Sequence, residues 1–423
     1  MISTDITLAN SSVDEDTLLD VASEIGFQLS INGAETFRIE ESVYRILKAY
    51  GFDAQVYAIP TYMHISIRTD SGKIISRMCR IGDHGTDMDG IELYSGLSRK
   101  ICEKKPDMKE AKRWMVEAMH SHEYYKKIMI YFAHFLAGGG FSLFFGGSFL
   151  DSLCGGICAL LSGIAERGLS NYRVNRFFRT AVAGFIMAYP AYVMAGLGII
   201  QNPDMAIVGA IMPLIPGLLF TNAMRDIFYG DTISAMNRML QVLLLATAIA
   251  LGASVAFYFA LNAWDMSEGY PICQYSCFIH GISCFIACIG FSILFNVHGT
   301  DVHVCAAGGL MVWVVYAAVY YLGYSELVSC FWASVFSGCF SECMARVRKN
   351  PAYAYLAVSL VPLIPGSGLY NTMRNAVRGD AQSFVTSCTN TILLAAVMCI
   401  GIIAVNSIFR LWGEVKSRAG IVR

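Results

Sequence analysis

Long apolar runs separated by short polar links fill the chain from about residue 128 onward, whereas the preceding residues alternate apolar and polar positions at shorter intervals. Each run has about the 20 residues that a helix needs to cross the hydrocarbon core of a bilayer. The pattern therefore predicts an α-helical, multi-pass membrane protein with about ten transmembrane segments. They are expected near residues 128–147, 149–166, 178–199, 204–223, 239–262, 273–297, 302–321, 325–344, 351–373 and 384–410.

The first 127 residues follow a different pattern, with apolar positions at helical spacing and then in alternation. Leu18, Val21, Ile25 and Leu29 would lie on one face of a helix. The predicted elements are helices within 14–50, strands at 54–60 and 63–69, a strand at 71–81 after the turn at Asp70-Ser71-Gly72, and helices at 88–104 and 107–127. Residues 1–127 are expected to form a small cytosolic α+β domain.

Composition agrees with this division. The chain is 55% hydrophobic and 15% charged, with a mean hydropathy of +0.51, yet residues 1–127 hold 36 of its 63 Asp, Glu, Lys and Arg residues. The net charge of −1 gives no reason to expect nucleic acid as a partner. No basic stretch followed by an apolar core opens the chain, so no signal peptide is expected. The 14 cysteines contain no C-x-x-C pair, so they are expected to be buried helix residues, and no metal or cofactor is predicted.

One block of the chain occurs twice. Residues 212–231 read MPLIPGLLFTNAMRDIFYGD and residues 361–380 read VPLIPGSGLYNTMRNAVRGD, which agree at ten of twenty positions. Proline removes a backbone donor from a helix and clashes with the preceding turn. In hydrocarbon, the resulting break is tolerated only where it is buried in protein or lines a wet cavity. Two broken segments at matching places in two half-chains are a typical sign of a transporter site.

The duplication extends over two sets of five segments, residues 128–262 and 273–410. Further matches are Gly140-Phe141-Ser142 with Gly290-Phe291-Ser292, Asp151 with Asp301, Asn202-Pro203 with Asn350-Pro351, and Gly252 with Gly401. Because five is odd, the second set must lie inverted in the membrane. The loop after the second segment has four arginines and its counterpart has none, whereas the loop after the third has no basic residue and its counterpart has three. This reversed charge bias fits inversion, with the N-terminal domain in the cytoplasm. Arg374 and Arg378 face outward in this topology and are exceptions to the rule.

The repeated block supplies the candidate substrate site. Opened helix backbone at Pro213, Pro216, Gly217, Pro362, Pro365 and Gly366 would expose carbonyl and amide groups to a polar solute. Arg225 and Arg374 could hold a carboxylate, and Asn222 and Asn371 could bind an amino or hydroxyl group. The alternatives are a structural kink that allows close helix packing, and loop ion pairs of the arginines with Asp231 and Asp380.

Carboxylates in the membrane part are candidates for ion or proton coupling, because charged groups retained in hydrocarbon usually face a polar interior. Asp151 and Asp301 lie at segment starts, where they could equally cap helices, and Asp231 and Asp380 close the repeated block. The remaining polar groups are His134, His280, His298, His303, Glu326 and Glu342. Their spacing does not predict a metal site. No G-x-S-x-G, nucleotide-binding loop or HExxH motif occurs, so neither an enzyme nor an ATP-driven pump is expected.

Several ordered motifs between about residues 15 and 410 resemble the threonine/serine exporter family. They are GAETFRIEESVYRI at 33–46, GGGFSLFFGGSFLDSL at 138–153, and the two PLIPG blocks. The resemblance implies export of threonine and serine driven by the membrane potential or a proton gradient. It also implies relatives split into two chains, some of which export dicarboxylates such as succinate. Glu35, Arg38 and Glu40 match the family's N-terminal signature, where a helix ion-pair ladder is expected.

The resulting hypothesis is a bacterial inner-membrane secondary exporter that works by alternating access. Its partners would be the lipid bilayer and a small-molecule substrate, threonine or serine, and a homo-oligomer is left open. A dicarboxylate exporter is the alternative within transport. A membrane-anchored sensor or hydrolase is the alternative of another class, but it does not explain a duplicated membrane part.

Overall fold

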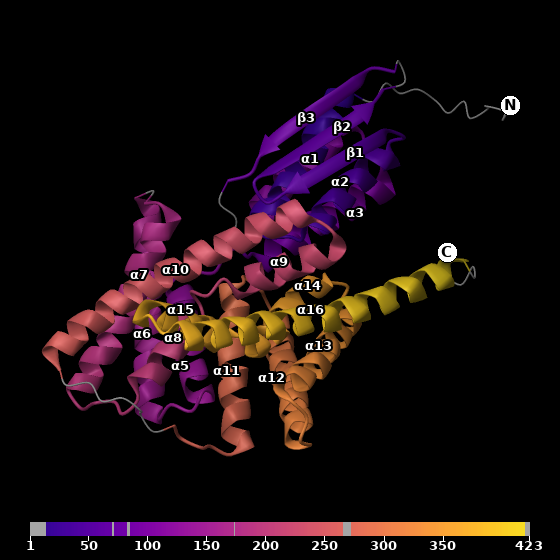
Figure 1. The fold of residues 1–423 in the computed structure, drawn as a ribbon. Coiled ribbons are helices and arrows are strands. Elements are labelled where there is room, and N and C mark those ends of the chain that lie inside the picture. Colours follow the sequence, from indigo (N-terminus) through magenta and orange to yellow (C-terminus); the bar gives the residue numbers. More distant parts are fainter. Residues whose placement is uncertain (1–13, 70–71, 83–84, 173, 265–271, 419–423) are drawn as a thin grey trace. The chain divides into compact units, whose positions relative to one another are not determined.

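The structure is a computed structural model that describes residues 14–69, 72–82, 85–172, 174–264 and 272–418. The chain divides into two compact units, one up to Tyr124 and one from Tyr125 onward, which are described separately below (Figure 1).

The first unit is a three-stranded antiparallel sheet, in the order β1-β2-β3, packed against helices. Its elements are α1 (Glu15–Ile31), α2 (Thr36–Ala49), β1 (Asp53–Ile59), β2 (Tyr62–Arg68), β3 (Ile74–Arg80), α3 (Met88–Lys104) and α4 (Met108–Ser121). In β2, alternate side chains Met63, Ile65 and Ile67 are buried, so one face of the sheet forms the core with α1 and α2. The predicted strands and hairpin therefore occur, although residues 70–71 of the predicted turn lie outside the described residues.

The N-terminal signature lies at the start of α2. Glu40 accepts a hydrogen bond of 2.8 Å from the backbone N–H of Ala58 and so fastens α2 to β1. Gly33, in the turn before α2, has φ +88, a conformation that other residues adopt only at a cost. The signature thus fixes the junction of α1, α2 and the sheet.

The second unit consists of helices. They are α5 (Lys127–Phe144), α6 (Phe149–Asn171), α7 (Arg176–Gly196), α8 (Pro203–Ile211), α9 (Gly217–Tyr229), α10 (Thr232–Ala263), α11 (Cys277–Leu294), α12 (Asp301–Tyr321), α13 (Glu326–Arg348), α14 (Ala352–Ser359), the 3-10 turn η1 (Val361–Leu363), α15 (Gly366–Arg378) and α16 (Ala381–Arg418). In Figure 1 the long helices α10 and α16 run across the bundle of α5, α6, α11 and α12.

Among the described residues, eight helices are long and apolar enough to cross a membrane, or nine if the bent pair of α14–η1 and α15 counts as one span. The predicted segments 204–223 and 351–373 are not single helices. The first is divided between α8 and α9, and the second is bent by 53° between η1 and α15. The reason is local, because the prolines at 213, 216, 362 and 365 lack the amide donors that a continuous helix needs.

The six helices α5–α10 recur in the same order as α11–α16, and equivalent helices make equivalent contacts. The two halves meet where α5 crosses α11. A Cβ atom on Gly140 would lie 2.9 Å from the backbone N of Ala287, and one on Gly290 would lie 2.7 Å from the backbone N of Ala137. Both pairs are related by the same shift of 150 residues. The helices α5 and α11 therefore pack against one another through glycines at equivalent positions of the repeat.

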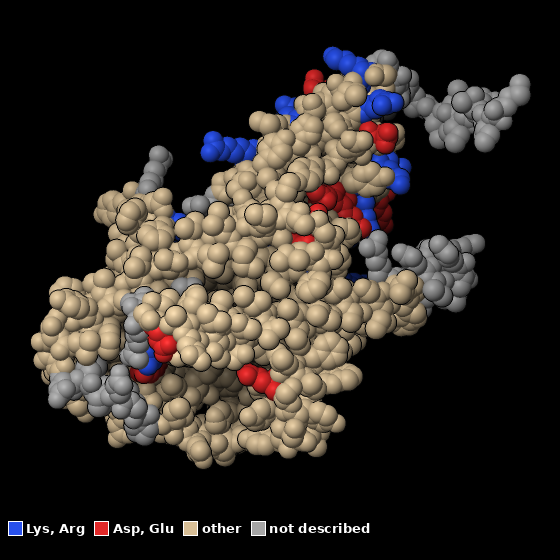
Figure 2. Space-filling model, viewed as in Figure 1, with Lys and Arg blue, Asp and Glu red and all other residues tan. Residues whose placement is uncertain are grey.

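Charged side chains are distributed unequally between the units. Figure 2 shows Lys, Arg, Asp and Glu gathered on the strands and helices of the first unit, whereas the helices of the second unit present a nearly uncharged surface in this view. Exposed apolar side chains of the second unit include Phe178, Leu240 and Leu244. This is the surface expected of helices that face lipid.

Candidate functional site

The two Pro-x-x-Pro-Gly breaks have the same backbone conformation. Pro216 precedes α9 with φ −75 and ψ 53, and Pro365 precedes α15 with φ −73 and ψ 59. In both, the glycine N–H bonds to the carbonyl two residues earlier, from Gly217 to Ile215 at 2.8 Å and from Gly366 to Ile364 at 2.6 Å. Each break therefore ends one helix in a tight turn and starts another.

The breaks also contact one another. A Cβ atom on Gly217 would lie 2.6 Å from Ile364, and one on Gly366 would lie 3.2 Å from Ile215 and closer still to Met212. The small glycines allow each break to pack closely against side chains of the other. The structure thus brings together two segments that are 149 residues apart in the sequence.

The arginine of the first repeat contacts the second half of the unit. Arg225, on α9, is buried, and its Nη2 donates to Asn222 Oδ1 at 3.0 Å. Asn222 Nδ2 in turn donates to the hydroxyl of Tyr353 on α14 at 2.8 Å. The guanidinium lies 6.0 Å from the centre of the Tyr353 ring. Arg225 and Asn222 therefore form one buried polar cluster with the start of α14.

The arginine of the second repeat makes the reverse contact. Arg374, on α15, forms an ion pair of 3.1 Å through Nη1 with Asp204 Oδ2, in the first turn of α8. Tyr370 lies one helical turn before Arg374 on α15. The interpretation of Arg374 as a loop ion pair with Asp380 is wrong, since Arg374 pairs with Asp204. Asp380 instead accepts a hydrogen bond of 3.1 Å from the N–H of Ser383.

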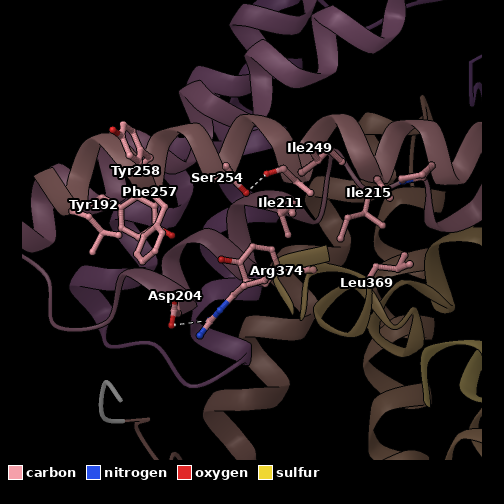
Figure 3. A pocket seen from close by; sticks show the side chains of 16 residues that line it. Tyr192, Asp204, Ile211, Ile215, Ile249, Ser254, Phe257, Tyr258, Leu369 and Arg374 are labelled. Carbon is pink, nitrogen blue, oxygen red and sulfur yellow. Dashed lines mark hydrogen bonds and ion pairs between the residues drawn. The ribbon is translucent and has the colours of Figure 1, made fainter. Parts of the chain in front are cut away.

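Arg374 lines a cavity of about 280 Å³, together with residues of α7, α8, α10, α15 and the first break (Figure 3). Figure 3 shows Arg374 and Asp204 pointing toward one another at one end of it. Its polar side chains are Tyr192, Asp204, Ser254, Tyr258, Tyr370 and Arg374. The other lining residues are aliphatic, aromatic or proline. The space therefore combines one cation, one anion and hydroxyl groups with a mostly apolar wall, which is typical of a small-molecule site.

The equivalent place in the other half is almost closed. A space of about 10 Å³ lies between Arg225, Asn222, Tyr353 and Cys399. At the shift of 149 residues of the repeated block, Thr221, Arg225 and Cys399 around this space correspond to Tyr370, Arg374 and Ala250 around the open cavity, so the two linings overlap. The closed one would hold about one water molecule. Related parts of the two halves therefore line one open space and one nearly closed space.

The other predicted site residues lie outside the open cavity, apart from Pro216 in its wall. Asn371 is exposed, whereas Asn222 is buried. Pro213 and Pro362 are half-buried within the breaks. Asp231 precedes the first turn of α10, as Asp380 precedes that of α16.

Asp151 and Asp301 anchor the linkers that precede the broken helices. Asp151 forms a capping box with Ser148 and also accepts hydrogen bonds of 3.1 Å from the N–H groups of Gln201 and Asn202. Asp301 accepts from Arg348 Nε at 2.8 Å and from Asn350 Nδ2 at 2.6 Å. The capping interpretation is therefore confirmed for Asp151. Each carboxylate fixes where the following broken helix begins.

Asp204, Tyr192 and Tyr370 line the open cavity but were not identified from the sequence. Asp204 follows Asn202-Pro203, where an acidic residue is explained by its position at the start of a helix. The sequence therefore does not indicate that it pairs with a residue far along the chain. The histidines and glutamates of the sequence analysis make no metal cluster in the described part of the chain.

Two family models match the chain. The first, described as "Putative threonine/serine exporter", covers residues 20–260, and the second, described as "Threonine/Serine exporter, ThrE", covers residues 280–408. A Klebsiella aerogenes protein named "Probable succinate transporter subunit YjjP" is 22% identical over 248 residues, which cover 55% of this chain and 90% of that protein. No solved structure matches significantly. With both models placed in order along one polypeptide, the chain is a member of the threonine/serine exporter family, in a form that joins the two parts.

Proposed function

We propose that this protein is a secondary exporter that moves threonine and serine across the bacterial inner membrane, driven by the proton-motive force. The observation that carries the proposal is the cavity at Arg374, which both halves of the membrane unit line around the two broken helices. In it, the guanidinium of Arg374 binds the substrate carboxylate by a two-pronged contact. Export involves no covalent chemistry, so the site requires only groups that bind the substrate on one side of the membrane and release it on the other.

Alternating access follows from the two equivalent pockets. The reciprocal contacts at α5 and α11, and at the two breaks, support a two-fold relation between residues 128–262 and 273–410. We take each broken pair, α8–α9 and α14–α15, as one crossing in addition to the four long helices of its half. Each half then crosses five times, which places the axis in the membrane plane and inverts the halves, as in other inverted-repeat transporters. The open Arg374 pocket and the closed Arg225 pocket would then exchange roles, with Asn222 and Asn371 assisting the arginines. The N-terminal domain, residues 1–127, lies in the cytoplasm.

Ion coupling is assigned to the carboxylates of the repeat, Asp151, Asp301, Asp231 and Asp380. Asp151 and Asp301 contact the linkers before α8 and α14, so a change in their charge would act on the position of the broken helices. Protonation of these carboxylates can therefore be coupled to transport, because the linkers must move when one pocket closes and the other opens.

Efflux from dipeptide-fed cells tests the proposal. Cells that lack the chain should accumulate threonine or serine when fed dipeptides containing them, and restoring the chain should clear the amino acid. Succinate should be measured in the same cultures, since a succinate effect without an amino-acid effect would refute amino-acid export.

Dicarboxylate export is the second candidate, and it is favoured by the name of the Klebsiella aerogenes relative. The same cavity would serve, with Arg374 on one carboxylate of the substrate. The two candidate substrates differ in the group that would lie next to Asp204, the second charged residue of the cavity.

A further inference from the structure

We propose that Asp204 binds the ammonium group of the substrate and thereby makes the cavity selective for zwitterionic amino acids over dicarboxylates. This inference rests on the proposed function and adds to it the residue that determines specificity. Asp204 was not among the predicted site residues, and its role comes from its position opposite Arg374.

The geometry places two opposite charges where one small molecule can meet both. Arg374 Nη1 and Asp204 Oδ2 are 3.1 Å apart, and their side chains are 32% and 28% exposed, so both reach the open space. Among the described residues that line the cavity they are its charged members. They come from different halves, α15 and α8, so a bound molecule that contacts both also bridges the halves.

Charge balance favours a zwitterion. The empty cavity holds one positive and one negative group and is neutral, and so is an amino acid with its ammonium and carboxylate on one carbon. Its binding exchanges the Arg374–Asp204 pair for two pairs, carboxylate to Arg374 and ammonium to Asp204. No charge is then left unpaired against the mostly apolar wall.

A dicarboxylate meets the opposite situation. It brings two negative charges to a space with one guanidinium, and its second carboxylate would face Asp204, which carries the same sign. Like charges at close range are strongly unfavourable in a low-dielectric site, and this repulsion selects against the wrong ligand.

The other half lacks this carboxylate. The position on α14 that corresponds to Asp204 is Ala352 by the Asn-Pro match or Tyr353 by the shift of the repeated block, and neither residue is acidic. Tyr353 contacts Arg225 and Asn222 through its ring and hydroxyl. The charge pair is therefore specific to the open cavity and is not imposed by the repeat. Tyr192 and Tyr370 line the same cavity as this charge pair.

Competition in everted membrane vesicles that contain the full chain tests the role of Asp204. The measurement is inhibition of labelled threonine transport by unlabelled threonine, by 3-hydroxybutyrate, which is threonine without its amino group, and by succinate. Wild-type protein should prefer threonine over both acids by at least about tenfold, the worth of one charged hydrogen bond. In Asp204→Asn this preference should fall to nearly one, mainly because threonine binds more weakly.

Glu326→Gln is the matched control, since it removes one carboxylate from an exposed position at the start of α13. It should keep the wild-type preference. A role in folding alone would lower the amount or rate of Asp204→Asn without changing the preference, and that outcome would overturn the inference. If Asp204→Asn does not reach the membrane, Asp204→Ser and ligand-induced thermal stabilisation of the purified protein give the same comparison.

The failures of the two proposals are distinguishable. Threonine transport by wild type with an unchanged preference in Asp204→Asn would refute the role of Asp204 and leave the exporter intact. Transport of succinate but not of threonine by wild type would refute both.

Discussion

Arg225 and Arg374 show how one residue in one motif acquires two environments. Both follow the break by the same number of residues, and both contact the first turn of the opposite half's broken helix. Arg225 is packed against an asparagine and a tyrosine in a closed space, whereas Arg374 pairs with a carboxylate at an open one. The difference arises from the partner residue, Tyr353 or Asp204. The repeated motif therefore predicts where the arginine stands, but not whether a carboxylate lies beside it.

Arg374→Gln should lower threonine efflux by about 10- to 100-fold, because it removes a charged hydrogen-bond donor to the substrate carboxylate. Arg374→Lys should be intermediate, since an ammonium group cannot make the two-pronged contact. Initial efflux rates, normalised to the amount of protein in the membrane, give the comparison. Arg346→Gln is the control, because Arg346 pairs with Glu342 on α13 outside the cavity. Equal rates for the two Gln variants would remove Arg374 from the site.

A second pair of equivalent positions gives a stability prediction. Asp226 and Arg238 form a buried ion pair of 2.9 Å between α9 and α10, with side chains 6% and 5% exposed. The equivalent positions in α15 and α16 are Asn375 and Ser387, joined by a hydrogen bond of 3.2 Å. Asp226→Asn alone removes the carboxylate that pairs with the buried Arg238 and should cost about 3–5 kcal/mol.

The double variant Asp226→Asn with Arg238→Ser copies the other half and should recover much of that loss. Melting temperatures of the purified variants in one detergent provide the test. A double variant less stable than Asp226→Asn would show that the two halves are not interchangeable at this contact.

At the scale of elements, the positions of the helix breaks could be predicted from prolines and glycines, since these residues change the backbone conformation at their own positions. The strands of the first unit were also predictable from alternation. What could not be predicted is how the pieces pack. Segment 204–223 was expected as one span, yet its parts α8 and α9 make separate contacts, and α8 carries Asp204 to the cavity. That contact joins residues 170 positions apart, and no local pattern specifies it.

Gly290→Ala should destabilise the membrane unit, because its Cβ would meet backbone atoms of α5 at 2.7 Å and the crossing helices would have to separate. The cost of such overpacking is about 1–3 kcal/mol. Gly281→Ala on the same helix is the matched control, as the nearest atom to its Cβ is the end of the Leu310 side chain at 3.2 Å. Thermal stability in detergent, followed by size-exclusion chromatography, should be lower for Gly290→Ala. Equal stability would contradict a close crossing of α5 and α11.

For the whole molecule, the account depends on two halves that are related by a two-fold axis in the membrane plane. The repeated order of helices, the shared shift of 149 or 150 residues and the reciprocal contacts support such a relation. An alternating-access transporter with inverted repeats has its two halves in different conformations, which fits one open and one nearly closed pocket. If each half adopts the conformation of the other, the site opens to the opposite side of the membrane.

Reporter fusions test the inversion. Residue 200 precedes α8 and residue 348 ends α13, so they follow equivalent helices of the two halves. A fluorescent reporter active only in the cytoplasm and a phosphatase active only outside should show position 200 outside and position 348 inside. Both positions on one side would exclude the inverted arrangement.

Transport by the purified full chain in proteoliposomes tests the central claim most directly, since no other protein is present. With a proton gradient imposed across the vesicle membrane, labelled threonine should move at a rate that collapses when an uncoupler is added, and Arg374→Gln should be nearly inactive. Succinate should move little under the same conditions. Succinate transport without threonine transport, or threonine movement unaffected by both the uncoupler and Arg374→Gln, would contradict the account.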